Sequence, residues 1–362
     1  MMSALVDYEL QTSPAASLTY NIIIVSYNNR HDLSACLNSL QDASCTGVIV
    51  VDNASQDGSA DFVRRSYGDV QVIESGENLG FSGGNNLGAA AAAGDVLVFL
   101  NPDTKVMPGS IETLVQALDT HPDAGAVTPK IVLTAQPDII NTCGNEVHYT
   151  GFGYIRGWQQ PATALNEATE VCAISGAAFA IRRSLYEALG GFDAIFSPAY
   201  GEDTDLSWRV RLAGYTCWHI PQAVICHDYR VDYTPTKFRW NERNRHQLLL
   251  KHLRWRTLLV LLPALLLAET VSWGYAVLSG WPYLRAKFEN YGWLIAHWTP
   301  LMQSRRQSQH TRRLRDRDLL AWCTHQLAYG QVSGGLTAKV AQRLFDPCFR
   351  FWKQVALSVI RW

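Results

Sequence analysis

The chain of 362 residues lacks the sequence patterns of several common protein classes. Its eight cysteines include no CxxC pair and no zinc-like spacing, and they lie at positions 36, 45, 143, 172, 217, 226, 323 and 348. This excludes a disulfide scaffold and a zinc finger, and we expect reduced, mostly buried thiols. The first seventeen residues include Asp7 and Glu9 and show no basic start followed by an apolar core. We therefore expect no secretion signal and a main domain in the cytosol.

An uninterrupted apolar run long enough to span a bilayer is also lacking. The run at 258–268 is broken by Pro263 and followed by Glu269, whereas a spanning helix needs roughly 20 apolar residues. Extending it to Trp281 would put Glu269 near the middle, which is costly unless its carboxylate is paired. We expect helices that lie in or dip into one leaflet, flanked by an interfacial belt of Arg254, Arg256, Trp273, Trp281, Arg285 and Lys287. The alternative is a soluble helical appendage.

Charged residues are scarce and unevenly distributed. They make up 17% of the chain, and the net charge is −1. Residues 1–236 hold 11 Lys and Arg against 26 Asp and Glu, whereas residues 237–362 hold 20 against 6. We expect the basic second half to face an anionic surface, either a membrane or the acidic first half, and we expect no nucleic-acid partner.

From Tyr20 onward, short apolar runs alternate with helical patterns, as a βα-repeating sheet requires. The patterns predict strands at 20–26, 47–52, 70–74, 96–100 and 126–133, with helices at 30–41, 58–67, 80–93 and 109–119. The fold class is therefore α/β, a mostly parallel sheet flanked by helices. The length exceeds what one typical core needs. We divide the chain into a tail at 1–19, an α/β domain at 20–236 and a basic, Trp-rich helical region at 237–362.

The regular alternation ends after residue 133. Residues 134–170 are mixed, and 171–181 predict one strand. A helix at 202–213 is followed by two short strands that end at His227, and a basic helix is expected at 240–257. The last helix has an apolar face made of Cys348, Trp352, Val355, Val359 and Trp362.

The stretch at 94–104, GDVLVFLNPDT, organises the predicted sheet. Its five apolar residues at 96–100 are typical of a strand buried on both faces, and Asp103 follows the strand's carboxyl end, where open α/β sheets bind ligands. A carboxylate there suits Mg²⁺ or Mn²⁺, which prefer oxygen ligands and would bridge it to a diphosphate. His227, at another strand end, is a further ligand candidate. Alternatively, Asp103 caps the next helix and His227 is a structural residue.

Two other loops lie at ends of the predicted strands. Asp52, in VDNAS, offers an acceptor for a base N–H or a ribose hydroxyl, or else caps a turn. The Gly-rich turn at 80–88 lets backbone approach a phosphate. A dinucleotide site is disfavoured, because GFSGGNNLG lacks GxGxxG and belongs to the third βα unit.

An acidic cluster opens the helix predicted at 202–213. Glu202, Asp203 and Asp205 suit a helix N-terminus, where the dipole favours negative charge. Three acids beside a metal–diphosphate centre exceed what capping needs. We expect one of them to act as a general base.

These motifs together resemble family 2 glycosyltransferases of the GT-A fold, nearest the bacterial rhamnosyltransferase-like branch. The resemblance covers about residues 20–230 and rests on VSYNN at 25–29, VDNAS at 51–55, ENLGFSGGNN at 77–86, LNPDT at 100–104, GGFD at 190–193, GEDTDLSWR at 201–209 and CHDYR at 226–230.

The resemblance implies a site and a reaction. Asp203 would be the base of an inverting transfer, Asp103 and His227 would bind the metal, and Asp52 with Asn85 and Asn86 would contact the donor. A dTDP- or UDP-sugar would be the donor, with rhamnose favoured. The acceptor would be a polyprenyl-linked or other glycan, at the cytoplasmic face of the inner membrane, with the protein bound peripherally or monotopically. The sequence has Asn101 where many relatives have Asp, which should weaken intrinsic metal affinity.

Three alternatives stay open. Another hexosyl- or galactofuranosyltransferase of the same fold would share these motifs. A nucleotidyltransferase would need a basic, Gly-rich first loop, which VSYNNRHD lacks. A catalytically silent scaffold of a polysaccharide assembly complex would not need Asp103, Asp203 and His227.

Overall fold

A ten-stranded mixed sheet organises the first half of the chain in the computed structural model, which describes residues 18–229, 233–331 and 336–362. The strand order is β10-β12-β6-β11-β4-β1-β2-β3, while β5 pairs with β12 and β7 with β6. A separate hairpin is formed by β8 (Asn145–Val147) and β9 (Gly153–Ile155). The strands of the large sheet are β1 (Tyr20–Ser26), β2 (Gly47–Asp52), β3 (Gln71–Glu74), β4 (Val96–Leu100), β5 (Thr104–Val106), β6 (Ala124–Leu133), β7 (Gln136–Thr142), β10 (Thr169–Glu170), β11 (Ala178–Arg182) and β12 (Thr216–His227).

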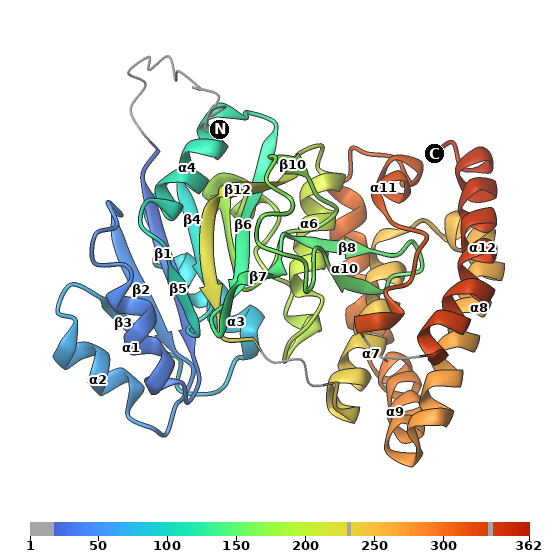
Figure 1. Cartoon of the computed structure of the whole chain (residues 1–362), viewed down its shortest axis with the longest axis horizontal. Helices are drawn as coiled ribbons and strands as arrows, with labels where there is room; N and C mark the ends of the chain where they lie inside the picture. Colours follow the sequence, from blue (N-terminus) through green and yellow to red (C-terminus); the bar gives the residue numbers. More distant parts are fainter. Residues whose placement is uncertain (1–17, 230–232, 332–335) are drawn as a thin grey trace, which may run out of the picture.

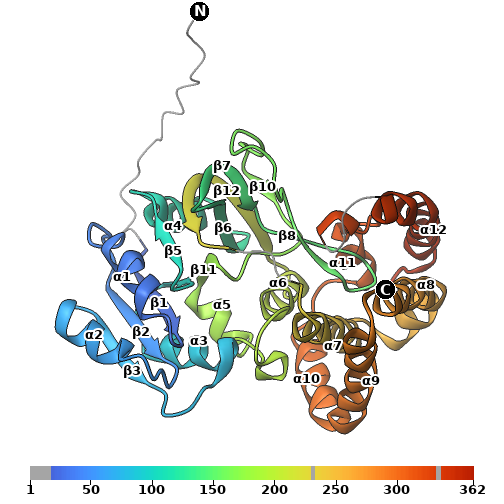
Figure 2. The same cartoon turned by 60° about the horizontal axis from the view of Figure 1, so that its bottom comes forward.

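The parallel part of the sheet, β3-β2-β1-β4, brings several strand ends to one edge. Ile24 pairs with Leu100, and Ser26 pairs with Asp52, so the loops after β1, β2 and β4 meet there. All five residues of β4 are buried, as expected for a strand covered on both faces. Helices flank the sheet (Figures 1 and 2). In this half they are α1 (Arg30–Asn38), α2 (Ser59–Ser66), α3 (Gly80–Ala90), α4 (Ser110–Thr120), α5 (Arg183–Ala188) and α6 (Glu202–Leu212).

The predicted α/β class is confirmed, but three predicted elements differ. Residues 171–181 are not one strand, because the chain turns at Gly176–Ala177 and only β11 enters the sheet. The two short strands expected before His227 form one strand, β12, whose register against β6 shifts between Ile220 and Val224. The basic helix expected at 240–257 begins at Pro235 and ends at His252.

The second half of the chain is helical and packs against the end of the sheet near α6 (Figure 1). Trp208 and Leu212 of α6 share one apolar cluster with Leu248, Leu261 and Phe349 of this region. The helices are α7 (Pro235–His252), α8 (Trp255–Ser279), α9 (Trp281–Ala296), α10 (Trp298–His310), α11 (Asp316–Trp322) and α12 (Leu336–Val359). The predicted boundary at 236/237 therefore falls within the first turn of α7, a helix that shares a core with α6. Residues 230–232, which include Arg230 of the CHDYR motif, lie outside the described part.

Within the described residues, α8 is the one helix whose length and composition suit a membrane crossing, with a mean hydropathy of 1.7 in its most apolar window. It is two-sided. One face is buried in the protein through Thr257, Leu261, Ala264, Ala268, Ser272 and Ala276. The opposite face exposes Trp255, Leu259, Leu262 and Leu266. At α12 the apolar face predicted from the sequence is only partly correct. Trp352, Val355 and Trp362 are partly buried, but Cys348 and Val359 are exposed, and Phe349, Ala356 and Ile360 are the buried side chains.

Candidate functional site

Two unpaired oxygens lie at the carboxyl ends of β1 and β2. Asp52 is 3% exposed, and its Oδ2 accepts a hydrogen bond from the Ser55 N–H at 3.1 Å. Its Oδ1 and the Ser26 hydroxyl are buried without a hydrogen-bond partner among the described residues. Because buried polar groups are usually paired, these two atoms are available to a polar ligand. Sequence reasoning named Asp52 but missed Ser26.

Asp103 and His227 face each other across the β5–β12 pairing. The register sets Thr104 opposite His227, and Asp228 N–H donates to the Asp103 carbonyl at 3.0 Å. The Asp103 Oδ1 atom lies 3.3 Å from His227 Nε2. The structure thus brings together two residues that are 124 positions apart and that sequence reasoning had paired.

The hydrogen bond of His227 to Asn141 makes this pair suitable for a cation. Asn141 Oδ1 lies 2.9 Å from Nδ1, and in the neutral tautomer that donates to it from Nδ1 the lone pair of the ring is on Nε2. That lone pair faces Asp103 Oδ1, which finds no hydrogen-bond partner among the described residues. Two acceptors at 3.3 Å repel unless a cation or a proton lies between them. A histidine whose second nitrogen is held by an outer oxygen is typical of metal sites, so the residues fit Mg²⁺ or Mn²⁺.

The segment 175–177 connects this pair to the acidic cluster of α6. Ala177 accepts a hydrogen bond from Asn101 N–H at 2.9 Å, and Gly176 N–H donates to Asp203 Oδ2 at 3.0 Å. The Asn145 amide also donates to this oxygen, at 2.9 Å. Burial raises the pKa of Asp203 above its usual value despite these hydrogen bonds, which increases its proton affinity. Asp203 is therefore the candidate general base of this cluster.

The two neighbouring acids differ from Asp203. Asp205 is fully buried and paired with Arg209 at 2.7 Å, Lys251 at 2.6 Å and His252 at 2.8 Å. Burial opposes ionisation, but Arg209 and Lys251, together with the hydrogen bond to His252, hold the pKa of Asp205 well below its usual value. Glu202 is 6% exposed, and burial together with Asp203 raises its pKa well above the usual value. Asp205 thus anchors α6 through ion pairs, whereas Glu202 is a buried acid whose charged form is disfavoured.

The two asparagines of α3 have hydrogen-bond partners within the protein. Asn85 is 2% exposed and donates to the Phe81 carbonyl at 3.0 Å. Asn86 donates to the Phe192 carbonyl at 2.8 Å and accepts hydrogen bonds from the Tyr186 hydroxyl and Phe192 N–H. Asn86 therefore ties α3 to the GGFD turn. Its role in a donor pocket, like that of Asn85, stays a prediction that these contacts do not support.

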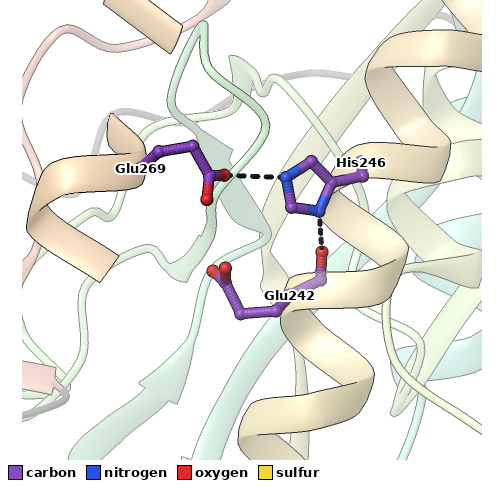
Figure 3. Close-up of side chains that lie close together, drawn as sticks. All are labelled: Glu242, His246 and Glu269. Atoms are coloured by element: carbon purple, nitrogen blue, oxygen red, sulfur yellow. Dashed lines mark hydrogen bonds and ion pairs between the residues drawn. The ribbon is translucent and has the colours of Figure 1, made fainter. Parts of the chain in front are cut away.

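A second cluster has metal-like spacing but different chemistry. Glu242, His246 and Glu269 bring their side chains together between α7 and α8 (Figure 3). Lys287 donates to Glu242 at 2.7 Å and to Glu269 at 2.8 Å, and Arg245 pairs with both carboxylates. Two cations already neutralise the two acids, so this cluster is an ion-pair network and does not fit a metal. It also supplies the partner that Glu269 needs in an apolar helix.

The chain is similar to known glycosyltransferases. Residues 21–190 match the family model described as glycosyl transferase family 2. Over 231 residues the chain is 29% identical to the N-acetylglucosaminyl-diphospho-decaprenol L-rhamnosyltransferase of Mycobacterium tuberculosis, covering 57% of this chain and 75% of that protein. It is also 29% identical over 237 residues to the pre-mycofactocin glycosyltransferase of the same organism, covering 64% of this chain and 47% of that protein.

Solved structures are similar in fold. The chain matches GalNAc-T7 with UDP, GalNAc and Mn²⁺ at a TM-score of 0.56 and 18% identity, covering 66% of this chain and about half, 49%, of that one. It matches S. aureus TarS 1–349 in complex with UDP-GlcNAc at a TM-score of 0.53 and 15% identity, covering 93% and 91%. At these identities the likeness concerns the fold alone, and it confirms the predicted GT-A-type arrangement.

Proposed function

Because the chain belongs to the family 2 glycosyltransferases, we propose that it moves a sugar, with rhamnose favoured, from a nucleoside-diphosphate sugar to a hydroxyl of a lipid-linked glycan. The observation that carries the proposal is the pair of facing acceptors, Asp103 Oδ1 and His227 Nε2, 3.3 Å apart at the ligand-binding edge of the sheet. A hard divalent cation, Mg²⁺ or Mn²⁺, would bind there and offset charge on a departing diphosphate. The GalNAc-T7 structure, which contains UDP and Mn²⁺, supports this assignment by analogy.

The protein residues divide the remaining work. Asp203 takes the proton of the acceptor hydroxyl, whose oxygen bonds to the anomeric carbon as the bond to the nucleoside diphosphate breaks. A single displacement of this kind inverts the anomer. Asn145 and Gly176 hold the Asp203 carboxylate in place through Oδ2. Asp52 Oδ1 accepts a hydrogen bond from the nucleoside, and the Ser26 hydroxyl forms a second hydrogen bond with it.

A lipid-linked acceptor is favoured by two independent observations. The rhamnosyltransferase relative carries a diphospho-decaprenol substrate in its name. In addition, most exposed large apolar side chains of the described residues lie in the second half, and the exceptions, in the first half, are Tyr27 and Met107. The exposed set in α8, α9, α10 and α12 is Trp255, Leu259, Leu262, Leu266, Val277, Leu278, Trp281, Phe288, Ile295, Trp298, Val340, Leu344, Phe351 and Val359.

This set, called here the apolar helical surface, supports peripheral or monotopic attachment at the cytoplasmic face of the membrane. Exposed apolar side chains on one face of several helices, with Trp and basic residues nearby, are typical of an interfacial membrane site. Glu269 does not oppose attachment, because its carboxylate is paired inside the protein with Lys287 and Arg245.

The experiment is a transfer assay with the full chain. Purified protein and Mn²⁺ are incubated with dTDP-rhamnose, UDP-galactofuranose or UDP-GlcNAc and a glycosyl-diphospho-prenol acceptor, and NMR reads the anomeric configuration of the product. The proposal expects a product whose anomeric configuration is opposite to that of the donor. Transfer with retention, or attack at the α-phosphate with transfer of the nucleoside monophosphate and release of a sugar 1-phosphate, would contradict it. Transfer from a donor other than dTDP-rhamnose would instead select the hexosyl or galactofuranosyl alternative.

A further inference from the structure

A cavity of about 550 Å³ lies between the segment after the GGFD turn and the helices α7, α9 and α10. Asp193 and Ser197 line it from the α/β domain, and Arg243, Trp293 and His297 line it from the helical region. Neither the donor site nor the Asp103–His227 pair contributes residues to it. The cavity therefore needs an explanation of its own.

Arg243 is the notable group in this cavity because its charge has no counterion. The side chain is buried, with 8% of the residue exposed, and stacks at 4.7 Å over the Trp293 ring. Its guanidinium donates to the Asn244 side-chain oxygen at 2.9 Å and to the Ser197 carbonyl at 2.5 Å. Within the described residues no carboxylate lies at ion-pair distance from it, whereas Arg239, one turn earlier, pairs with Glu289 at 2.8 Å.

The other charged groups at the cavity do not neutralise Arg243. Asp193 lines the same cavity, but its Oδ2 is bound by Lys251 at 2.6 Å and by the Ser304 hydroxyl. Burial, with a contribution from Arg239, lowers the pKa of Arg243 to about 10, so it is still protonated at neutral pH. An unpaired buried charge is costly, and an anion bound in the cavity would remove that cost.

The cavity lies between the segment that leads into α6 and two helices of the apolar helical surface, α9 and α10. Arg243 and Asn244 hold the carbonyls of Ser197 and Ala199, in the segment that leads directly into α6 and Asp203. Two of the helices that line the cavity, α9 and α10, also carry the exposed apolar side chains Ile295 and Trp298. A ligand whose anionic centre joins a sugar to an apolar chain would match these neighbours.

We propose that this cavity is a subsite for a phosphorylated headgroup and that Arg243 is the cation that recognises it. Resting on the proposed function, the assignment is to the diphosphate of the lipid-linked acceptor. A guanidinium binds phosphate oxygens through parallel N–H donors, and the neutral donors of Gln303 and Gln307 line the same cavity.

Isothermal titration of the full-length protein with inorganic pyrophosphate, in EDTA and with saturating UDP, tests the subsite. Wild type is expected to bind, and Arg243→Gln is expected to bind about 10- to 100-fold more weakly, since charge-assisted hydrogen bonds contribute roughly 1.5–3 kcal/mol. Arg243→Lys should recover part of the affinity. Arg239→Gln, which removes a cation paired on the surface, is the matched control and should bind like wild type. Equal affinity of wild type and Arg243→Gln, or equal loss in Arg239→Gln, would overturn the proposal.

Two sedimentation experiments with vesicles distinguish the source of the phosphate. The same variants are sedimented with phosphatidylglycerol vesicles, with and without a prenyl diphosphate in the bilayer. The proposal expects the Arg243→Gln defect only when the prenyl diphosphate is present. A defect of the same size without it would overturn the acceptor assignment and identify the phospholipid headgroup instead. None of these readouts needs sugar transfer, so a failed transfer assay would refute the proposed function and leave this test intact.

Discussion

At the scale of single residues, contacts distinguish carboxylates that the sequence presents as equals. Glu202, Asp203 and Asp205 open the same helix, yet Asp205 is enclosed by cations and Asp203 by neutral donors. These partners come from Asn145 and Lys251, which are 58 and 46 positions from the acids they contact. The sequence predicts the cluster, but only the resemblance to the family, and no local pattern, singles out Asp203 as the expected base.

The first prediction concerns that base. Asp203→Asn preserves shape but cannot accept a proton, so turnover should fall by roughly 10²–10⁴-fold while donor affinity is retained. Because the pKa of Asp203 is raised, wild-type turnover should also decline as pH falls through this raised value, where the base becomes protonated. Steady-state kinetics over pH 4–8 would measure both effects. Near-normal turnover of Asp203→Asn would contradict this role and indicate Glu202 as the base instead.

The second prediction concerns the metal pair. Asp103→Ala removes the carboxylate that faces His227, so Mn²⁺ should no longer strengthen binding of the donor nucleotide. Calorimetry with UDP and dTDP, with and without Mn²⁺, would measure this. Asp61→Ala, which removes an exposed carboxylate on α2, is the control and should bind like wild type. A full Mn²⁺ effect in Asp103→Ala would remove Asp103 from the metal site.

At the scale of elements, the strands that follow simple local patterns were predicted best. β1, β2 and β4 coincide with their predicted ranges because short buried apolar runs between turn residues are typical of parallel strands. The error at 171–181 has a tertiary cause: Gly176 leaves the sheet so that its N–H reaches Asp203. Likewise, only tertiary packing reveals that Asn86 is used to hold Phe192.

The contact between α6 and α7 gives the third prediction. Asp205→Asn leaves Lys251 and Arg209 buried beside a neutral side chain, so the free energy of unfolding should fall by about 3–5 kcal/mol. Urea unfolding at neutral pH would measure it. Asp318→Asn, which breaks a partly exposed pair with Arg315, should cost about 0–1 kcal/mol and is the control.

The stabilisation that Asp205 provides depends on pH, and its direction follows from the lowered pKa of this residue. The pKa of Asp205 is lowered in the folded state, so its stabilisation is present above the unfolded value of 3.8 and is lost as pH falls below it. The difference between wild type and Asp205→Asn should therefore narrow in acid. A constant difference down to pH 2, or a cost no larger than that of Asp318→Asn, would contradict the assigned role.

The exposed face of α8 gives the fourth prediction. Leu262→Glu combined with Leu266→Glu places two charges on the apolar helical surface without touching its buried side. Affinity for phosphatidylglycerol vesicles should fall at least about 10-fold at any salt concentration, since each inserted leucine contributes roughly 1.5–3 kcal/mol. Met107→Glu, at an exposed apolar residue of the α/β domain, should sediment like wild type. Undiminished sedimentation of the double variant would contradict membrane attachment through α8.

At the scale of the whole molecule, the two oppositely charged halves contact each other. Lys251 and His252 of the basic half bind Asp193 and Asp205 of the acidic half, which is one of the two partners that the charge asymmetry predicted. Trp208 lies in an apolar cluster built from both halves. The helical region therefore does more than extend the α/β domain: it holds the helix that carries Asp203.

The fifth prediction tests the central claim, that the chain is a metal-dependent transferase acting on nucleotide sugars. The measurement is nucleoside diphosphate release by the full-length protein from a panel of dTDP-, UDP- and GDP-sugars, with Mn²⁺ or with EDTA. We predict release from at least one sugar nucleotide in Mn²⁺, its loss in EDTA, and its loss in Asp103→Ala under both conditions. No release from any donor, or release that is equal in Mn²⁺ and EDTA, would contradict the account.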